Sequence, residues 1–274
     1  MENPLQQYFR SPGAFIKLPS MGKFYKTPPK LSIDGELAVY PMTAEDEIWL
    51  KNPDTLLNGE GLKKIIKSCT PDIQDIDEVP ISDADVILIG ARLATYGEDF
   101  DVTSECPECK KSTDYTFKLT EILSNVKEID KTPIVEISEL KVYLQPSRIN
   151  IQTKIAMASL EYQMMLRELD TSKTDNKKQL QIMTEYSTKL TKLNFENLRD
   201  GIIKIDMPDG NHVGTPEHIL EWLKNITKPE YDKLQGALEE LNKSGTDLTY
   251  DAECQGCKHK YKTAISSDPI SFFA

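Results

Sequence analysis

The sequence predicts an α+β protein that is mostly helical, with short β-hairpins and a zinc-ribbon-like site of four cysteines. Two matched knuckles, Cys106-Pro-Glu-Cys109 and Cys254-Gln-Gly-Cys257, lie far apart in the chain. Short alternating segments flank each knuckle, which predicts strand, knuckle, strand in both halves. Between the knuckles, apolar residues recur mostly at helical spacing. The two halves of the zinc ribbon are therefore expected to be separated by a helical insert.

The four knuckle cysteines form a candidate metal site. Two residues between cysteines allow a tight turn to present both sulfurs to one ion, and zinc binds four thiolates tetrahedrally. We predict one structural zinc ion per chain, held by Cys106, Cys109, Cys254 and Cys257. Four thiolates leave no open position for a substrate. Because the knuckles are a domain's length apart in the sequence, metal binding must offset the entropy of closing a long loop. The zinc is therefore expected to stabilise the fold by joining two distant segments.

The composition limits the classes of protein that fit. The 274 residues are 39% hydrophobic and 28% charged, as in ordinary soluble proteins. No run approaches the roughly 18 apolar residues of a membrane span, and the start lacks a signal sequence, so we expect a cytoplasmic protein without membrane contact. The net charge of −11 disfavours binding to nucleic acid. The fifth cysteine, Cys69, is expected to be a buried free thiol rather than a nucleophile.

Residues 1–40 are expected to form an extended arm and a hairpin. Prolines and glycines interrupt any helix there, but the segment is rich in aromatic and aliphatic residues. Such a composition indicates an arm that packs either on its own domain or on a partner, and the sequence favours neither alternative. Asp34-Gly35 predicts a hairpin turn between residues 31–33 and 36–40.

Residues 41–98 are expected to form a helical N-terminal domain. Thr43 and Asp46 form a capping pattern before a first helix, and residues 56–69 predict a second. Ser82 is expected to cap a third helix that ends at Gly97. The apolar run at residues 87–89 is expected to lie in the central core.

Residues 99–120 and 246–265 are the expected ribbon halves, residues 121–245 the mainly helical insert, and residues 266–274 a tail. In the insert, alternation predicts a hairpin of residues 134–137 and 141–144. Two long helices, 151–169 and 177–198, are expected to pair in an antiparallel manner. A strand at 201–206, a helix opened by Thr215-Pro216 and a last helix at 229–241 complete the insert. Four methionines on the long helices are expected to lie in the core, because their spacing is core-like, although a methionine-rich partner groove would have the same spacing; they are Met157, Met164, Met165 and Met183.

The residues offer little support for catalysis. The sequence lacks a glycine-rich phosphate loop, a nucleophile elbow and a zinc-protease helix. The carboxylate clusters at 45–47 and 75–78 are more typical of helix starts and loops than of acid/base pairs. His259 follows the second knuckle, but four thiolates leave it no role as a ligand; His212 and His218 fit a loop and a helix start. Lysines near the knuckles are expected to offset the negative charge of a four-thiolate site; they are Lys110, Lys111, Lys258, Lys260 and Lys262.

The first half of the chain contains long ordered strings that carry a resemblance. They include Phe15-Ile-Lys-Leu-Pro-Ser-Met-Gly-Lys-Phe-Tyr25 and Glu36-Leu-Ala-Val-Tyr-Pro-Met-Thr-Ala-Glu-Asp-Glu47, and continue through residues 51–59, 65–73 and 85–97. These strings resemble the baseplate proteins of T-even-like contractile-tailed phages, in particular their hub subunit and hub assembly family. The resemblance covers roughly residues 12–125.

The resemblance implies a role in building the central hub of a phage tail baseplate. Such a protein is either a chaperone-like assembly factor or a component that stays in the virion. The expected partners are other baseplate hub or tail proteins, met in the host cytoplasm during assembly, and no small-molecule substrate is expected. A zinc-ribbon protein that binds nucleic acid is the alternative, supported by the lysines near the knuckles, and a hydrolase is a third. The sequence itself assigns no catalytic residue.

Overall fold

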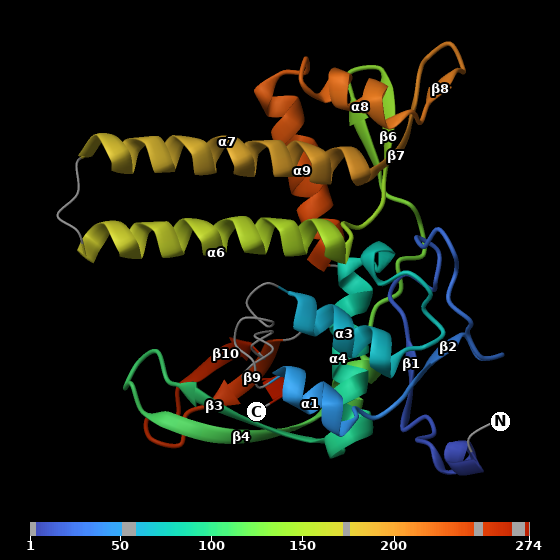
Figure 1. Ribbon diagram of the computed structural model, residues 1–274, viewed down its shortest axis with the longest axis vertical. Coiled ribbons are helices and arrows are strands. Elements are labelled where there is room, and N and C mark those ends of the chain that lie inside the picture. The colour runs from blue at the N-terminus through green and yellow to red at the C-terminus, as the bar shows by residue number, and fades with distance from the viewer. Residues whose placement is uncertain (1–3, 51–58, 172–175, 244–248, 265–271, 274) are drawn as a thin grey trace.

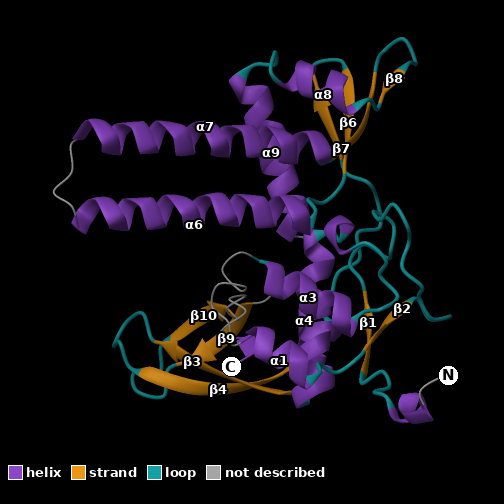
Figure 2. Ribbon diagram, in the orientation of Figure 1, coloured by secondary structure: helices purple, strands orange, loops and turns teal. Residues whose placement is uncertain are grey.

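The computed structural model describes residues 4–50, 59–171, 176–243, 249–264 and 272–273. Figure 1 shows a lower part that contains the N-terminal helices and the cysteine hairpins, and an upper part built from the insert. The strands of the described residues form four small sheets, and helices make up most of the rest (Figure 2). The α+β class with short antiparallel sheets is therefore confirmed.

The N-terminal arm forms one strand of a small sheet. After the short 3-10 helix η1 (Pro4–Tyr8), β1 (Ala14–Lys17) pairs antiparallel with β2 (Glu36–Val39). The turn at Asp34-Gly35 exists, because the Gly35 N–H donates to the Ser32 carbonyl at 3.0 Å and Gly35 has a φ of 76°. The predicted partner of the second strand was wrong, since β2 pairs with β1 rather than with residues 31–33. The burial explains this result: Ile16 of β1 and Leu37 of β2 are both buried in the core.

The described residues that follow form three α-helices, in the order expected. α1 (Ala44–Leu50) begins with the predicted capping box: the Asp46 N–H donates to Thr43 Oγ1 at 3.2 Å and the Thr43 N–H to Asp46 Oδ2 at 2.7 Å. α3 (Glu60–Cys69) and the 3-10 turn η2 (Ile76–Glu78) lead into α4 (Ile81–Tyr96). The predicted cap of α4 was wrong, because Pro80 is its N-cap and Ser82 lies inside the first turn. The first residues of the predicted second helix, 56–58, lie outside the described residues.

α4 is the centre of the first hydrophobic core. Ile87, Leu88 and Ile89 are at most 8% exposed, which confirms their predicted place. The arm packs on this helix: Ile16 and Leu18 are buried in the same core. The arm is also held by a buried carboxylate, Asp83, which accepts hydrogen bonds from the N–H and hydroxyl of Ser20 and from the hydroxyl of Tyr25. Of the two alternatives for residues 14–25, packing on the chain's own domain is the one observed.

The two cysteine hairpins flank the insert in sequence. β3 (Asp99–Glu105) pairs with β4 (Ser112–Lys118), and β9 (Thr249–Glu253) pairs with β10 (Lys260–Ala264), each around one knuckle. This arrangement is the predicted order of strand, knuckle and strand. A short helix, α5 (Leu119–Ser124), follows β4.

The insert is less purely helical than expected. Its predicted hairpin, β5 (Ile134–Ile137) with β6 (Leu140–Leu144), extends through β7 (Ile202–Asp206) to β8 (His212–Val213) in a four-stranded antiparallel sheet. α8 (Pro216–Leu223) and α9 (Lys228–Lys243) supply Ile219, Leu234 and Leu238 to the core beside this sheet. The sequence missed the sheet because β6 and β7 are far apart in the chain. Thr215 is the N-cap of α8, as expected, but its side chain makes no capping bond.

α6 (Ile149–Thr171) and α7 (Asn176–Asp200) lie side by side and project from the rest of the molecule (Figure 1). Their small core contains the buried residues Ile151, Ala158 and Leu193. The expectation that the methionines lie in the core was wrong: Met164 is 55% exposed and Met183 is 47% exposed. No described helix is long and apolar enough to cross a membrane.

Two phenylalanines near the end of the sequence complete the first core. Phe272 and Phe273 are 5% and 8% exposed, and the Phe272 ring lies 5.2 Å from that of Phe100 on β3. The Arg92 guanidinium donates to the Phe272 carbonyl at 2.6 Å and stands 4.6 Å from the Phe100 ring. The tail expected at 266–274 thus contributes two buried side chains, while residues 265–271 lie outside the described part.

Phe272→Ala is expected to lower the free energy of unfolding by about 3 kcal/mol, because it removes a buried ring from the first core. Denaturant unfolding of the purified protein measures the change. The matched control is Phe15→Ala, since Phe15 is 57% exposed and its loss should change stability by only about 0.5 kcal/mol. Equal effects of the two substitutions would contradict the packing of Phe272.

Asp83 is expected to make stability depend on pH. Burial raises the pKa of its carboxyl to about 6, although hydrogen bonds from Ser20 and Tyr25 oppose the shift. The pKa of Asp83 in the folded protein lies above its value in the unfolded chain. The contribution of Asp83 to the free energy of unfolding is therefore fully present below about pH 4 and is lost as the pH rises through about 6. The free energy of unfolding falls by about 3 kcal/mol over this pH range.

The isosteric variant Asp83→Asn tests this dependence, because it cannot ionise. Unfolding curves at a series of pH values from 4 to 7 should show that the wild-type protein loses stability relative to the variant as the pH rises. A constant difference between the two proteins across this range would mean that Asp83 does not titrate there.

Candidate metal centre

The two knuckles have the same backbone geometry. In the first, the Lys110 N–H donates to the Cys106 carbonyl at 3.0 Å and the Cys106 N–H to the Lys111 carbonyl at 3.0 Å. In the second, the Lys258 N–H donates to the Cys254 carbonyl at 2.9 Å and the Cys254 N–H to the His259 carbonyl at 2.9 Å. The residue after the second cysteine of each knuckle has a left-handed backbone conformation, with φ of 59° at Lys110 and 60° at Lys258. Both turns therefore present their cysteine pairs in the same way.

The four predicted cysteines come together. Their sulfur atoms all lie within 4.8 Å of one another, with Cys106 Sγ 3.6 Å from Cys257 Sγ and Cys109 Sγ 3.5 Å from Cys254 Sγ. Zinc with four thiolates at about 2.3 Å places its sulfurs about 3.8 Å apart. The four sulfurs thus have the spacing of a tetrahedral thiolate site and could hold a metal ion.

The surroundings favour the thiolate at Cys254 in particular. At Cys257 the His259 backbone favours the thiolate, but desolvation and the neighbouring cysteines prevail and raise the pKa of that thiol to about 12. Cys106 and Cys254 are fully buried, whereas Cys109 and Cys257 are exposed. The N–H groups of Cys257 and Gly256 point at Cys254 Sγ and hold the pKa of that thiol at about 6; the Gly256 bond is 3.3 Å long. This thiol loses its proton near neutral pH, and the resulting thiolate is the form that binds metal.

Contacts between the hairpins hold the two knuckles together. The Tyr115 hydroxyl donates to the Glu253 carbonyl at 3.1 Å and lies 3.3 Å from the Tyr261 hydroxyl. The rings of Phe117 and Tyr250 stack with their centres 3.9 Å apart. The alternation of residues 115–119 predicts a half-buried strand, but no spacing relative to the cysteines marks its contact with the second hairpin. These residues add a packed interface to the cysteine cluster.

The lysines near the knuckles are partly paired with nearby carboxylates. Lys110 Nζ lies 3.8 Å from a Glu105 carboxylate oxygen, and Lys258 Nζ lies 3.8 Å from that of Glu253. Each pair is exposed and therefore weak. The two glutamates reduce the positive charge that these lysines offer to an outside anion.

The other candidate residues do not assemble into a second centre. Among the described residues, the four cysteines form the only group of three or more potential metal ligands. The ring of His259 stacks on Tyr261 rather than joining that group. The acidic clusters serve local structure: Asp46 caps α1, the Asp75 carboxylate accepts from the Asp77 N–H at 3.1 Å, and Glu78 pairs with Lys26 at 2.6 Å. Cys69 is fully buried, and burial raises the pKa of its thiol to about 12.

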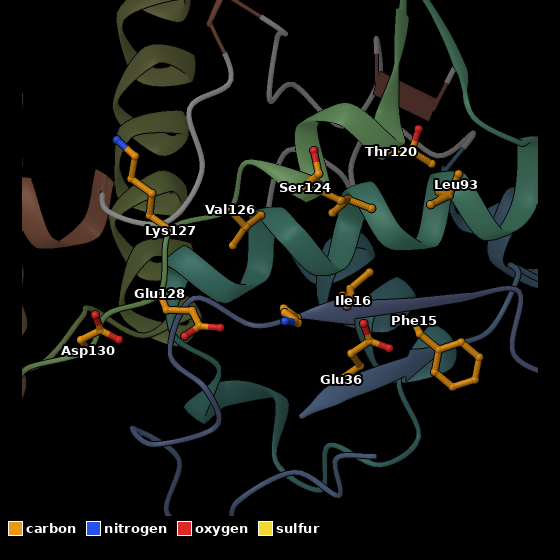
Figure 3. Close-up of a pocket in the computed structure, with 12 residues that line it drawn as sticks. Phe15, Ile16, Glu36, Leu93, Thr120, Ser124, Val126, Lys127, Glu128 and Asp130 are labelled. Carbon is orange, nitrogen blue, oxygen red and sulfur yellow. The ribbon is translucent and has the colours of Figure 1, made fainter. Parts of the chain in front are cut away.

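A groove of about 760 Å³ lies apart from the cysteines (Figure 3). β1 and Glu36 of β2 line one side, Leu93 of α4 contributes to its lining, and α5 with residues 126–130 lines the other side. The groove carries both lysines and carboxylates, with apolar side chains from Ile16, Leu93, Leu123 and Val126. The groove leaves no local pattern in the sequence, because its sides come from segments distant in the chain.

Comparison with known proteins identifies the family. The sequence model of the family described as T4 bacteriophage base plate protein matches residues 24–274. No curated protein and no solved structure matches the chain. The match covers most of the chain, including both knuckles, the insert and the strings from Glu36 onward that carried the resemblance, whereas most of the first string, residues 15–25, precedes it. The chain therefore belongs to the T4 bacteriophage base plate protein family.

Proposed function

We propose that this protein is a structural or assembly subunit of the central hub of a contractile phage tail baseplate, where it acts through contacts with other hub or tail proteins. The observation that carries the proposal is the family match over residues 24–274. Membership of this family supports a location in the virion tail and a structural rather than catalytic role. The exposed apolar side chains of Phe15, Met164 and Leu180 supply contact surface of the kind such a role needs.

The cysteine cluster supports one structural zinc ion per chain, bound by Cys106, Cys109, Cys254 and Cys257. The sulfur spacing and the paired knuckles fit a closed four-thiolate site. In this role the metal joins the hairpins at the two ends of the insert and so fixes the base of a module that begins near β4 and ends near β9. The site thus contributes to the shape of the subunit rather than to chemistry.

The nucleic-acid alternative has less support. It rested on the lysines around the knuckles, but Lys110 and Lys258 each lie beside a glutamate of their own hairpin. The chain as a whole carries a net charge of −11. A protein with this balance has no excess of positive charge to attract phosphates.

Elemental analysis of the purified protein is expected to find one zinc ion per chain. Cys106→Ser and Cys254→Ser should each lose the metal and lower the melting temperature by at least about 5 °C, because each removes one ligand and loosens the closure of a long loop. Cys69→Ser is the matched control, since it changes a buried cysteine outside the cluster and should retain the zinc. A metal-free protein with unchanged melting temperature would rule out the site.

Co-expression with candidate hub and tail proteins, followed by affinity purification, is expected to give a stable complex with at least one of them. Mass spectrometry of purified virions then distinguishes a retained component from a transient assembly factor. The wild-type protein provides the folded control, and Cys106→Ser tests whether the complex depends on the metal-bound fold. Failure of the folded protein to bind any tail protein would contradict a hub role.

A further inference from the structure

Two sulfur pairs in the cysteine cluster connect one knuckle to the other. Cys106 Sγ lies 3.6 Å from Cys257 Sγ, and Cys109 Sγ lies 3.5 Å from Cys254 Sγ. Both contacts cross from the β3–β4 hairpin to the β9–β10 hairpin, which lie side by side (Figure 1). A disulfide bond holds its sulfurs about 2.0 Å apart. Each pair therefore has to close by only about 1.5 Å to form such a bond, a movement that rotation about the Cα–Cβ bonds can supply.

Each of these pairs combines an exposed cysteine with a buried one. Cys109 and Cys257 are exposed, whereas Cys106 and Cys254 are fully buried. An oxidant in the solvent therefore reaches one sulfur of each pair first. The buried cysteine in the opposite hairpin then lies beside the oxidised sulfur. An accessible sulfur next to a second, resolving cysteine is the usual arrangement of cysteines that form disulfides on oxidation.

Contacts that involve no sulfur keep the two hairpins together. The rings of Phe117 and Tyr250 stack with their centres 3.9 Å apart, and the Ser104 hydroxyl donates to Thr263 Oγ1 at 3.0 Å. These four residues come from β4, β9, β3 and β10, so every strand of the two hairpins takes part. Loss of a metal ion therefore leaves the cysteines of the two knuckles next to each other.

We propose that the cysteine cluster is also a redox modification site, at which a hydroperoxide converts the four cysteines into two disulfide bonds, Cys106–Cys257 and Cys109–Cys254. These bonds join the same hairpins that a metal ion joins, so the closure of the insert persists after the metal is released. The inference goes beyond the proposed hub function. It depends on the positions of the sulfurs and not on the identity of the metal.

The oxidation of each pair balances in two steps. The exposed thiol attacks one oxygen of hydrogen peroxide, the O–O bond breaks, and a sulfenic acid and one water form. The buried thiol then attacks the sulfenic sulfur, the S–S bond forms as the S–O bond breaks, and a second water leaves. Two thiols thus give two electrons and two protons to one peroxide. Two metal-bound thiolates take the two protons from the solvent instead, and they release the ion because disulfide sulfurs are not thiolate ligands.

Disulfides between the hairpins stabilise the fold more than disulfides within a knuckle. The cysteines of the two pairs are 151 and 145 positions apart in the chain. A bond between such distant positions removes more entropy from the unfolded chain than one that closes a single knuckle turn. Under the proposed function, a tail subunit leaves the reducing cytoplasm in which it is made. The disulfide form then keeps the insert closed where thiols are no longer kept reduced.

Tryptic peptide mapping without reduction tests the pairing in the full chain. Trypsin cleaves after Lys and Arg, so both cysteines of the first knuckle lie in peptide 93–110 and both of the second in peptide 244–258. After treatment with hydrogen peroxide and a zinc chelator, these peptides should be recovered as one covalent pair that separates on reduction. Tandem mass spectrometry should assign the two proposed bonds. Two separate peptides with internal disulfides would overturn the proposal, as would cross-links between other sulfur pairs or cysteines oxidised only to sulfinic acid.

Cys69 is the internal control, because it is fully buried in the first core and lies outside the cluster. Its thiol should stay reduced. The number of free thiols per denatured chain should therefore fall from five to one on oxidation and return to five after treatment with dithiothreitol. Oxidation of Cys69 as fast as that of the cluster would overturn the proposal, because the cluster would then have no special reactivity.

Melting temperatures show whether the oxidised cluster keeps the insert closed. The oxidised, metal-free protein should melt at least about 5 °C above the reduced, metal-free protein, because the cross-links restrict the unfolded chain. The double variant Cys106→Ser with Cys257→Ser keeps one proposed pair and should still gain stability on oxidation. The matched double variant Cys106→Ser with Cys109→Ser keeps only one knuckle and should gain none. A wild-type protein that oxidation does not stabilise would overturn the proposal, as would equal gains in the two double variants.

Discussion

The architecture depends on one closure: two hairpins that are remote in the sequence meet at their knuckles. The Cys106 and Cys257 sulfurs lie 3.6 Å apart, and Tyr115 reaches the Glu253 carbonyl across the same junction. The segment between β4 and β9 must therefore begin and end at nearly the same place. The insert satisfies this constraint with its own four-stranded sheet and with α9, which returns the chain toward the second hairpin.

The first core shows the same convergence of distant segments, but on a helix. α4 is buried along most of its length, so it is covered from several directions by other parts of the chain. The arm covers it through Ile16 and Leu18, and Phe272 reaches the same core beside Arg92. Asp83 places a carboxylate in this apolar region, where three hydrogen bonds from Ser20 and Tyr25 offset part of the cost of its lost hydration. The arm is thus held by polar as well as apolar contacts.

Local signals predicted the local features, and long-range packing decided the rest. The Thr43–Asp46 capping box, the knuckle turns and the long helices follow from short-range spacing, and the structure has all three. The partner of β2 did not follow from the Asp34-Gly35 turn, because burial against α4 selected β1 instead. The groove beside β1 could not be foreseen for a related reason: its sides are brought together only by the tertiary fold.

The exposed methionines of α6 and α7 show the limit of a periodicity argument. Spacing identifies an apolar stripe, but it does not say whether the chain itself covers that stripe. Near the start of α6 and the end of α7, Ala158 and Leu193 are buried between the two helices. Met164 and Met183 lie nearer the turn that joins the helices and remain about half exposed. A pair of helices that buries little apolar surface gains little stability from packing. The outer part of this hairpin therefore has an energetic reason to be covered in an assembly, which agrees with a subunit of a multiprotein baseplate.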